Sequence, residues 1–326
     1  MARIVIATPK ENFERYGFHI PEDWDVAFAT PQTLEEELLT RQKDVEILLV
    51  GSGQVVSRKV IESCPSLKQI QTEGVGFEQV DVEAAKERGI AVCNNKGANA
   101  ISVAEHAVGL MLAGLRRTSL TDRQLRTIGY QNTKFAHMKV GEHTLAGKTV
   151  GLIGFGDIGK EVAKRLRCWD CNVVYNDILD MSPEIIAEYH VTYKDFDELI
   201  KTCDIISMHV PVTPLTTHMI GKDQFLAMKN TALLINTSRG PVIDQDALIW
   251  ALENDEIYGA ALDVVTPEPL PEDAPILHMS EKAMDKIILT PHVAGMTDED
   301  FERMNFMSIQ AIKRALAKEE PINKVY

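Results

Sequence analysis

The chain lacks long hydrophobic runs. Its longest uninterrupted stretch of apolar and small residues is "AVGLMLAGL" (107–115), in 326 residues. A bilayer crossing needs about 20 apolar residues, so this stretch predicts a buried helix. The N-terminal "MARIVIATPK" turns polar too early for the apolar core of a signal peptide and predicts a first strand. We therefore expect a soluble, cytoplasmic protein with no membrane partner.

Positive charge is also scarce. Lys and Arg number 34 against 48 Asp and Glu, which gives a net charge of −14. Nucleic acids and anionic membranes are bound through clustered positive charge, so this balance argues against both kinds of partner.

Cysteines are few, and their spacing forms no framework. The chain has five, an odd number that fits a reducing compartment. Cys168 and Cys171 form one C-x-x-C, "CWDC", without a second pair. We therefore expect neither a redox centre nor a metal site.

Internal repeats and low-complexity tails are absent, and short apolar runs alternate with helical patterns instead. This alternation predicts βαβ units, parallel sheets and ligand sites beyond the carboxyl ends of the strands. Because the strands number nine or more, we expect two α/β domains. The strands are expected at 3–8, 46–50, 67–72, 90–94, 148–154, 172–177, 204–210, 231–236 and 287–290, and the helices at 81–88, 100–117, 159–167, 245–255 and 297–318.

A glycine-rich turn follows one predicted strand and precedes a helix. Gly154, Gly156 and Gly159 stand in G-x-G-x-x-G, where they permit a tight turn, close approach of a pyrophosphate and helix–strand packing. The helix starting near Asp157 would direct its N–H groups at the phosphates. Asp177 ends the next strand, where a carboxylate binds the ribose hydroxyls. It would repel a 2′-phosphate, so NAD is favoured over NADP.

Three reactive residue types follow three successive strands. Arg239 ends "LLINTSR", Glu268 lies in the Pro-rich loop after a strand ending at Asp263, and His292 follows Ile287-Ile288-Leu289. Histidine can deliver a proton to a carbonyl oxygen during hydride transfer, and a neighbouring carboxylate raises its pKa. Arginine holds a substrate carboxylate with two donors. The combination predicts reduction of a 2-oxo acid.

The chain resembles the D-isomer-specific 2-hydroxyacid dehydrogenase family along nearly its whole length. The resemblance rests on the glycine-rich turn and on "GVGFEQVDVEAAKERGIAVCN" (74–94), "AEHAVGLMLAGLRR" (104–117), "NTSRGPVIDQDAL" (236–248), "ALDVVTPEPLP" (261–271) and "TPHVAG" (290–295). It implies two doubly wound parallel-sheet domains. A Rossmann NAD domain (100–292) would be inserted in a discontinuous, flavodoxin-like substrate domain (1–99 and 293–326).

The resemblance also implies a set of site residues. The catalytic residues would be His292 as acid–base, Glu268 as its partner and Arg239 as substrate anchor. Backbone N–H groups around Val75 and Gly76 would hold the substrate carboxylate with Arg239 and His292. The cofactor NAD would contact Gly154, Gly156, Asp157, Ile158, Gly159, Asp177, His209, Val210, Pro211, Thr216, Thr237, Ser238, Asp263, His292 and Gly295. No metal is expected, and family members are usually homodimers, joined through the helix carrying "AEHAVGLML".

The substrate is expected to be a small, unphosphorylated 2-oxo acid such as glyoxylate or hydroxypyruvate. Phosphoglycerate-binding relatives carry arginines where this chain has Gly51 and Thr72, with Glu73 adjacent. Arg58 could substitute, so phosphoglycerate dehydrogenation stays an alternative. An NAD-sensing corepressor is a second alternative. With no regulatory domain after the last predicted helix and no extended N-terminal segment, we expect neither regulation nor a formate-type substrate.

Overall fold

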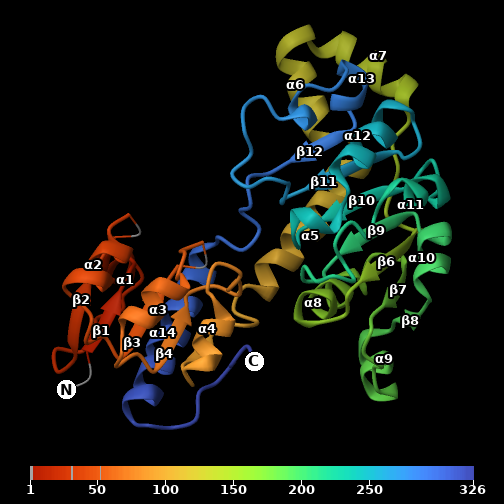
Figure 1. Ribbon diagram of the computed structural model, residues 1–326. Helices are drawn as coiled ribbons and strands as arrows, with labels where there is room; N and C mark the ends of the chain where they lie inside the picture. The colour runs from red at the N-terminus through yellow and green to blue at the C-terminus, as the bar shows by residue number, and fades with distance from the viewer. Residues whose placement is uncertain (1–2, 31, 52) are drawn as a thin grey trace. The chain divides into compact units, whose positions relative to one another are not determined.

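The computed structural model describes residues 3–30, 32–51 and 53–326 of the chain. It contains two compact units, one running from the N-terminus to Asn99 and from Met296 to Tyr326, the other covering Ala100–Gly295 (Figure 1). The domain boundary was expected after residue 292, whereas the boundary between the two compact units lies after Gly295. The reason is local, because the backbone N–H groups of Val293 and Ala294 donate to Asp263 of the second unit.

The first unit is built on a five-stranded sheet. Its strands are β1 (Arg3–Ile6), β2 (Asp25–Phe28), β3 (Ile47–Val50), β4 (Gln69–Thr72) and β5 (Ala91–Cys93). Its helices are α1 (Lys10–Arg15), α2 (Leu34–Thr40), α3 (Arg58–Ser63), α4 (Val82–Glu87) and α14 (Asp298–Leu316). The strand order is β2-β1-β3-β4-β5, and all pairs are parallel. This is the order of flavodoxin-like sheets.

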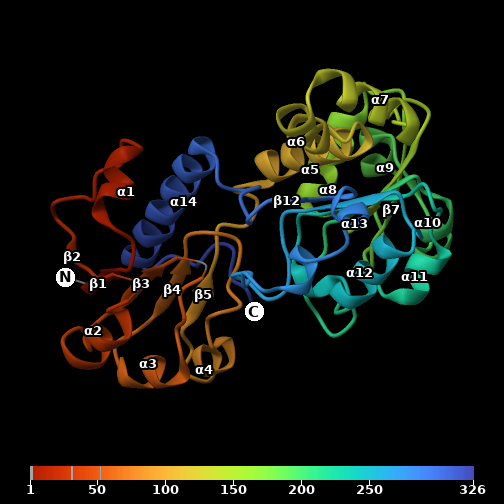
Figure 2. The same cartoon turned by 90° about the horizontal axis from the view of Figure 1, so that it is seen from above.

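Both faces of this sheet are covered (Figure 2). Helices α2, α3 and α4 pack on one face, with Val5 and Leu48 among the strand residues below them. Phe13 of α1 and Ile312 of α14 pack on the other, against Ile4 and Ile47. Since successive strand residues point to opposite faces, this double coverage explains why the central strand β3, "ILLV", is apolar and buried throughout.

The second unit is built on a seven-stranded parallel sheet. Its strands are β6 (Thr149–Ile153), β7 (Asn172–Asn176), β8 (Thr192–Tyr193), β9 (Ile205–Met208), β10 (Leu233–Asn236), β11 (Gly259–Leu262) and β12 (Ile287–Leu289). The order is β12-β11-β10-β9-β6-β7-β8. Strands β7 and β8 are added on one side of β6 and strands β9 to β12 on the other, so the direction in which strands are added reverses between the neighbours β6 and β9. At such a switch point the carboxyl ends of the strands open a crevice for ligands.

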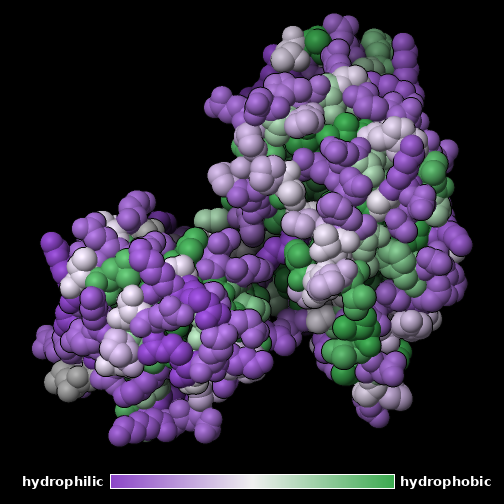
Figure 3. Space-filling view, in the orientation of Figure 1, coloured by the Kyte–Doolittle hydropathy of each residue, from purple (hydrophilic) through white to green (hydrophobic). Residues whose placement is uncertain are grey.

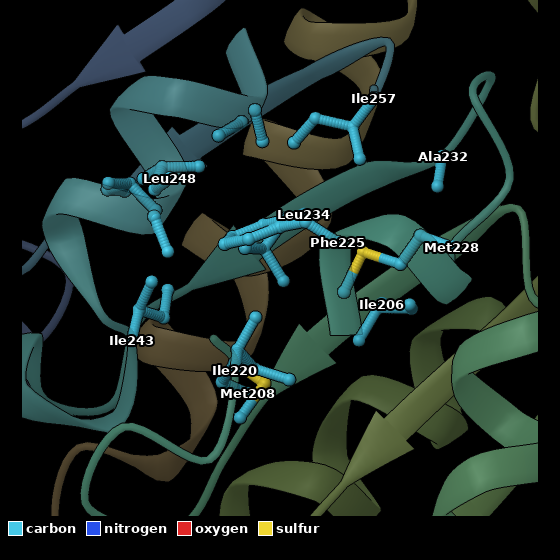
Figure 4. Close-up of a cluster of buried hydrophobic side chains, with 14 of the residues drawn as sticks. Ile206, Met208, Ile220, Phe225, Met228, Ala232, Leu234, Ile243, Leu248 and Ile257 are labelled. Carbon is cyan, nitrogen blue, oxygen red and sulfur yellow. The ribbon is translucent and has the colours of Figure 1, made fainter. Parts of the chain in front are cut away.

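The helices of this unit also cover both sheet faces. They are α5 (Ala100–Leu115), α6 (Thr118–Ile128), α7 (Tyr130–Val140), α8 (Asp157–Leu166), α9 (Pro183–Tyr189), α10 (Phe196–Thr202), α11 (Lys222–Ala227), α12 (Gln245–Glu253) and α13 (Glu281–Met284), with 3₁₀ turns η1 (Gly240–Val242) and η2 (Pro275–Leu277). One core, under α10 to α12, includes Phe225, Leu234 and Leu248 (Figure 4). The other joins α5 and α8 to the opposite face.

The predicted fold class of two doubly wound parallel sheets is confirmed. The sequence pattern missed two strands, β2 and β8, which are short edge strands with partly exposed residues. The five helices named from the sequence correspond to α4, α5, α8, α12 and α14, so α1 to α3, α6, α7, α9 to α11 and α13 were not among them. The helix expected over 100–117 ends at Leu115. Arg117 there adopts a left-handed φ of 48°, which breaks the helix before α6.

Candidate active site

The glycine-rich turn joins β6 to α8 as predicted. Gly154 has φ 93°, and a Cβ added there would overlap the carbonyl oxygen of His209 at the end of β9. A Cβ on Gly159 would overlap the carbonyl oxygen of Gly154, so α8 packs closely against the turn. Among the described residues nothing lies within 4 Å of the Cβ position of Gly156. That open space adjoins the N-terminus of α8, where N–H groups attract a pyrophosphate.

Asp177 lies directly after β7 with its carboxylate fixed in place. Its Oδ2 accepts from Phe155 N at 2.6 Å, and its Oδ1 accepts from Leu179 N at 2.9 Å. These bonds tie the carboxylate to the glycine-rich turn and leave further lone pairs for ribose hydroxyls. Asp157 and Ile158 form the first turn of α8 next to it.

Two buried polar side chains at the crevice have no hydrogen-bond partner among the described residues. The unpaired atoms are both ring nitrogens of His209, which follows β9, and the hydroxyl of Thr237, which follows β10. Burial lowers the pKa of His209 to about 4, so its ring is neutral. Unpaired buried polar groups are costly, and these ones lie where NAD is expected. The residues present therefore fit this cofactor.

The other predicted cofactor residues lie in the same strand-end loops. Val210 and Pro211 follow His209, and the Thr216 hydroxyl donates to the Pro211 carbonyl at 2.6 Å, which closes that loop. Ser238 Oγ donates to Asn236 Oδ1 at 2.8 Å. Gly295 is the last residue of the second unit.

Arg239 follows β10 in a loop that Asn236 organises. Asn236 is fully buried, its Nδ2 donates to the carbonyl of Arg239 at 2.9 Å, and its Oδ1 accepts from Ser238 N at 3.0 Å. The Arg239 guanidinium, which is partly buried, donates to the Ser238 carbonyl at 2.8 Å. The side chain of Arg239 thus starts from a backbone that the fold holds rigidly.

The loop carrying Glu268 packs against the loop carrying Arg239. A Cβ on Gly240 would overlap the carbonyl oxygen of Val265, so only glycine permits this approach. Gln245, in the first turn of α12, exchanges two hydrogen bonds with the backbone of Thr266, at 2.8 and 3.2 Å. The sequence pattern did not single out Asn236, Gly240 or Gln245. Their adjacency to Arg239 was the available signal.

His292 and Glu268 form the predicted pair. His292 Nδ1 lies 2.7 Å from Glu268 Oε2, while Glu268 Oε1 accepts from Val265 N at 3.1 Å. The hydrogen bond to Glu268 raises the pKa of His292 above its ordinary value, against the effects of burial and of the Arg239 charge. Burial alone would raise the pKa of Glu268, but the bonds from His292 and Val265 N and the nearby positive charges lower it.

Arg239, Glu268 and His292 therefore come together at the carboxyl edge of one sheet. They follow β10, β11 and β12, which are adjacent in the strand order. The loops of Arg239 and Glu268 are in contact, because Gly240 lies directly against the carbonyl oxygen of Val265. A protonatable imidazole, its carboxylate partner and a fixed cation at a nucleotide crevice can together serve carbonyl reduction.

Asp263 has a different environment from the one expected of a cofactor contact. It is 1% exposed, and its carboxylate accepts from Thr290 Oγ1 at 2.5 Å and from Val293 N and Ala294 N at 2.9 Å. Among the described residues, Oδ2 accepts a single hydrogen bond, which leaves it a lone pair for a further donor.

Val75 and Gly76 lie in the first unit, after β4. Asn94 Nδ2 donates to the Val75 carbonyl at 2.7 Å, and Asn95 N donates to the Gly74 carbonyl at 2.9 Å. Within the described part of the chain, the N–H groups of Val75 and Gly76 donate to no acceptor. They are thus available to an anion.

The five cysteines are free, and the described residues hold no cluster of His, Cys, Asp or Glu that could bind a metal ion. A search of the same residues for helices long and apolar enough to cross a bilayer found none.

Comparison with known proteins places these features in a family. The model of "D-isomer specific 2-hydroxyacid dehydrogenase, NAD binding domain" matches residues 108–294. The chain is 39% identical over 94% of its length to a D-3-phosphoglycerate dehydrogenase of Methanocaldococcus jannaschii, of which it spans only 56%. It is 37% identical over 93% of its length to a glyoxylate reductase of Thermofilum pendens, of which it spans 86%.

A solved structure resembles the chain equally broadly. D-lactate dehydrogenase from Aquifex aeolicus, complexed with NAD and lactic acid, superposes with a TM-score of 0.82 at 27% identity, covering 97% of this chain and 96% of that one. The predictions of an NAD-binding domain and of the family are both confirmed. The chain belongs to the D-isomer-specific 2-hydroxyacid dehydrogenase family.

Proposed function

We propose that the protein uses NADH to reduce a small, unphosphorylated 2-oxo acid to its D-2-hydroxy acid, and catalyses the reverse reaction with NAD. The observation that carries this proposal is the 2.7 Å pair of His292 and Glu268, with Arg239 close by, at the carboxyl edge of the nucleotide-binding sheet.

His292 acts as the acid–base. Its Nδ1 is held by Glu268, which leaves Nε2 to face the substrate carbonyl. Bound NADH would supply the hydride for the substrate carbon, and the role of His292 is to give its Nε2 proton to the carbonyl oxygen as negative charge develops there. Glu268 stabilises the imidazolium beforehand, which is why the pKa of His292 is raised. In oxidation His292 takes the proton back.

Each unit offers one candidate group for binding the substrate carboxylate. Arg239 offers the planar pair of donors that matches a carboxylate. The N–H groups of Val75 and Gly76, held by Asn94 and Asn95, supply uncharged donors. In this proposal the first unit is the substrate domain and the second the NAD domain.

NAD is the proposed cofactor in preference to NADP. The negative charge of Asp177 lies at the end of β7, and Ile178 and Leu179 follow it as exposed apolar residues. No cation in this segment compensates for a 2′-phosphate, which Asp177 would repel.

An unphosphorylated substrate is supported by the first unit. Gly51 and Thr72 bring no positive charge to the ends of β3 and β4. Arg58 donates to Glu87 at 2.7 Å and lies 3.6 Å from both Glu62 and Asp81. Since three carboxylates already surround Arg58, it offers little to a phosphate dianion. Glyoxylate and hydroxypyruvate are therefore the preferred substrates.

Phosphoglycerate dehydrogenation is the second candidate, because the relative of that name is 39% identical. A substrate panel separates the two. NADH oxidation is followed with glyoxylate, hydroxypyruvate and pyruvate, and NAD reduction with D-glycerate and 3-phosphoglycerate, all repeated with the NADP forms. The best kcat/KM on 3-phosphoglycerate would refute our substrate class. A protein that binds NADH but turns over no 2-oxo acid would favour the corepressor alternative.

We also propose a cytoplasmic homodimer. The five free thiols fit a reducing compartment. Most apolar residues of α5 are buried in their own unit, so apolar surface for a second copy is found instead on α6 and α7. There Leu125, Ile128, Tyr130, Phe135, Met138 and Val140 are exposed, whereas much of the face in Figure 3 is hydrophilic. Light scattering of Phe135→Glu/Met138→Glu should report monomers where the unmodified protein gives dimers.

A further inference from the structure

The backbone at His292 is held in an unusual conformation. His292 has a left-handed φ of 54°, which few residues other than glycine adopt. Its N–H donates to the carbonyl of Asp263 at 2.8 Å, and the next two N–H groups, of Val293 and Ala294, donate to the Asp263 carboxylate. The turn that presents the His292 side chain is therefore wrapped around Asp263.

Asp263 is in turn connected to Thr290. The Thr290 hydroxyl lies 2.5 Å from Asp263 Oδ1. An ionised carboxylate only accepts hydrogen bonds, so Thr290 must donate its single hydroxyl proton to Asp263. The hydroxyl oxygen is then left as an acceptor.

His106 of α5 supplies the donor to that oxygen. Its Nε2 lies 3.1 Å from Thr290 Oγ1 and 3.6 Å from Asp263 Oδ1. Because the Thr290 proton is committed to Asp263, His106 Nε2 must carry a hydrogen and donate it. Helix α5 is a rigid support, since six of its side chains are buried in the core that it shares with the sheet and α8.

We infer that His106 is a positioning residue, which acts through Thr290 and Asp263 to hold the turn that aims His292 at Glu268. The expected effect on catalysis rests on the proposed function. The hydrogen bonds from His106 to Asp263 can be tested without any substrate. The titratable and charged groups at this connection are Asp263 and His106 themselves, with Glu268 and Arg239 on the side of His292. Glu105, next to His106, is paired with Arg165 at 2.9 Å.

The test removes one hydrogen bond at a time. Thr290→Val and His106→Leu each remove a hydrogen-bonding group from the connection while keeping the volume of the side chain similar. Thr290→Ser keeps the hydroxyl, and His106→Gln places an amide nitrogen near the position of Nε2. Thr202→Val is the matched control, because its hydroxyl bonds only within and beside α10, to the Glu198 carbonyl at 2.7 Å and from Lys194 at 3.3 Å.

The first readout is the pKa of His292, measured without substrate by NMR of protein labelled at the histidine rings. Its signal is assigned among the nine histidines as the one missing in His292→Gln. We expect Thr290→Val and His106→Leu to lower this pKa toward the ordinary histidine value, since a loosened turn weakens the bond to Glu268. The Ser and Gln variants should restore it.

The second readout is kinetic. In Thr290→Val and His106→Leu, kcat should fall on the order of 10- to 100-fold, as expected for a displaced reactive group, while the KM for NADH stays within about twofold. An unchanged pKa of His292, or Ser and Gln variants no better than Val and Leu, would overturn the inference. If the unmodified protein reduces no 2-oxo acid, the proposed function fails, but the NMR measurement still decides the connection.

Discussion

The carboxyl edges of the two sheets carry different chemistry. In the seven-stranded sheet, charged side chains follow three adjacent strands, and hydrogen bonds fix the loops that carry them. In the five-stranded sheet, the loop after β4 presents the backbone N–H groups of Val75 and Gly76, and it is held by the Asn94 carboxamide and the Asn95 backbone N–H. In our proposal the first edge serves proton transfer through side chains, and the second serves anion recognition through backbone N–H groups.

Of the five substitutions, loss of His292 should have the largest effect. It tests whether proton transfer belongs to the edge of the seven-stranded sheet. We expect His292→Gln to lower kcat for glyoxylate or hydroxypyruvate reduction by about 1,000-fold, because general acid catalysis contributes roughly that much. NADH affinity, measured by fluorescence titration, should hardly change. His278→Gln, whose ring donates to a carbonyl in a neighbouring loop, is the control. An unchanged kcat for His292→Gln would remove this residue from the mechanism.

Arg239→Lys tests whether the cation must be planar. A lysine keeps the charge but loses the paired donors, so kcat/KM for the 2-oxo acid should fall about 100-fold, mainly through KM. The measurement is steady-state kinetics at saturating NADH. The exposed Arg167→Lys serves as control, and an equally active Arg239→Lys would show that the planar pair of donors is not required.

Glu268→Gln should change both rate and pH dependence. Reduction needs protonated His292, so its rate falls as pH rises through the pKa of His292. Glu268 raises that pKa, so the Gln variant should lose activity at lower pH than the unmodified protein, with kcat down about 10-fold. The pH profile of reduction checks this, with the exposed Glu272→Gln as control. Coinciding profiles would mean that Glu268 does not act on His292.

Asp177→Ser combined with Ile178→Arg extends the test to the cofactor end of the same sheet. Removing the negative charge and adding a cation should shift the ratio of kcat/KM for NADPH over NADH upward about 10-fold. Asp177→Asn removes only the charge and keeps an oxygen for Phe155 N, so it separates repulsion from loop anchoring. A ratio unaffected by either variant would place the ribose elsewhere.

Gly51→Arg adds a side-chain cation to the first unit. Its effect on activity should be the smallest of the five. The Cβ position of Gly51 has open space around it among the described residues, so the fold should tolerate the change. Activity with 3-phosphoglycerate should improve by up to about fivefold, the scale of an exposed ion pair. Gly51→Gln is the uncharged control. An equal gain in both variants would exclude electrostatics as the cause.

The sequence predicted most of this architecture, because in parallel sheets both faces are buried and each strand is an apolar run with a clear end. It missed β2 and β8, because edge strands are short and partly exposed. Among the candidate site residues, it placed Arg239, Glu268 and His292 correctly at strand ends. Asp263 was expected only as a cofactor contact. Its bonds to Thr290, Val293 and Ala294 were missed because they join residues far apart in the chain.

The order of residues alone determined the strand ends, the glycine turn and the types of reactive groups, since each depends on a few neighbouring residues. Tertiary structure decided which strand ends became neighbours and which hydrogen bonds fixed them. The 2.7 Å pair of His292 and Glu268 and the contact of His106 with Thr290, 184 residues apart, exist only because β11, β12 and α5 pack together. Hydrogen bonds depend on distance and angle, which the packing of the elements sets and local sequence does not.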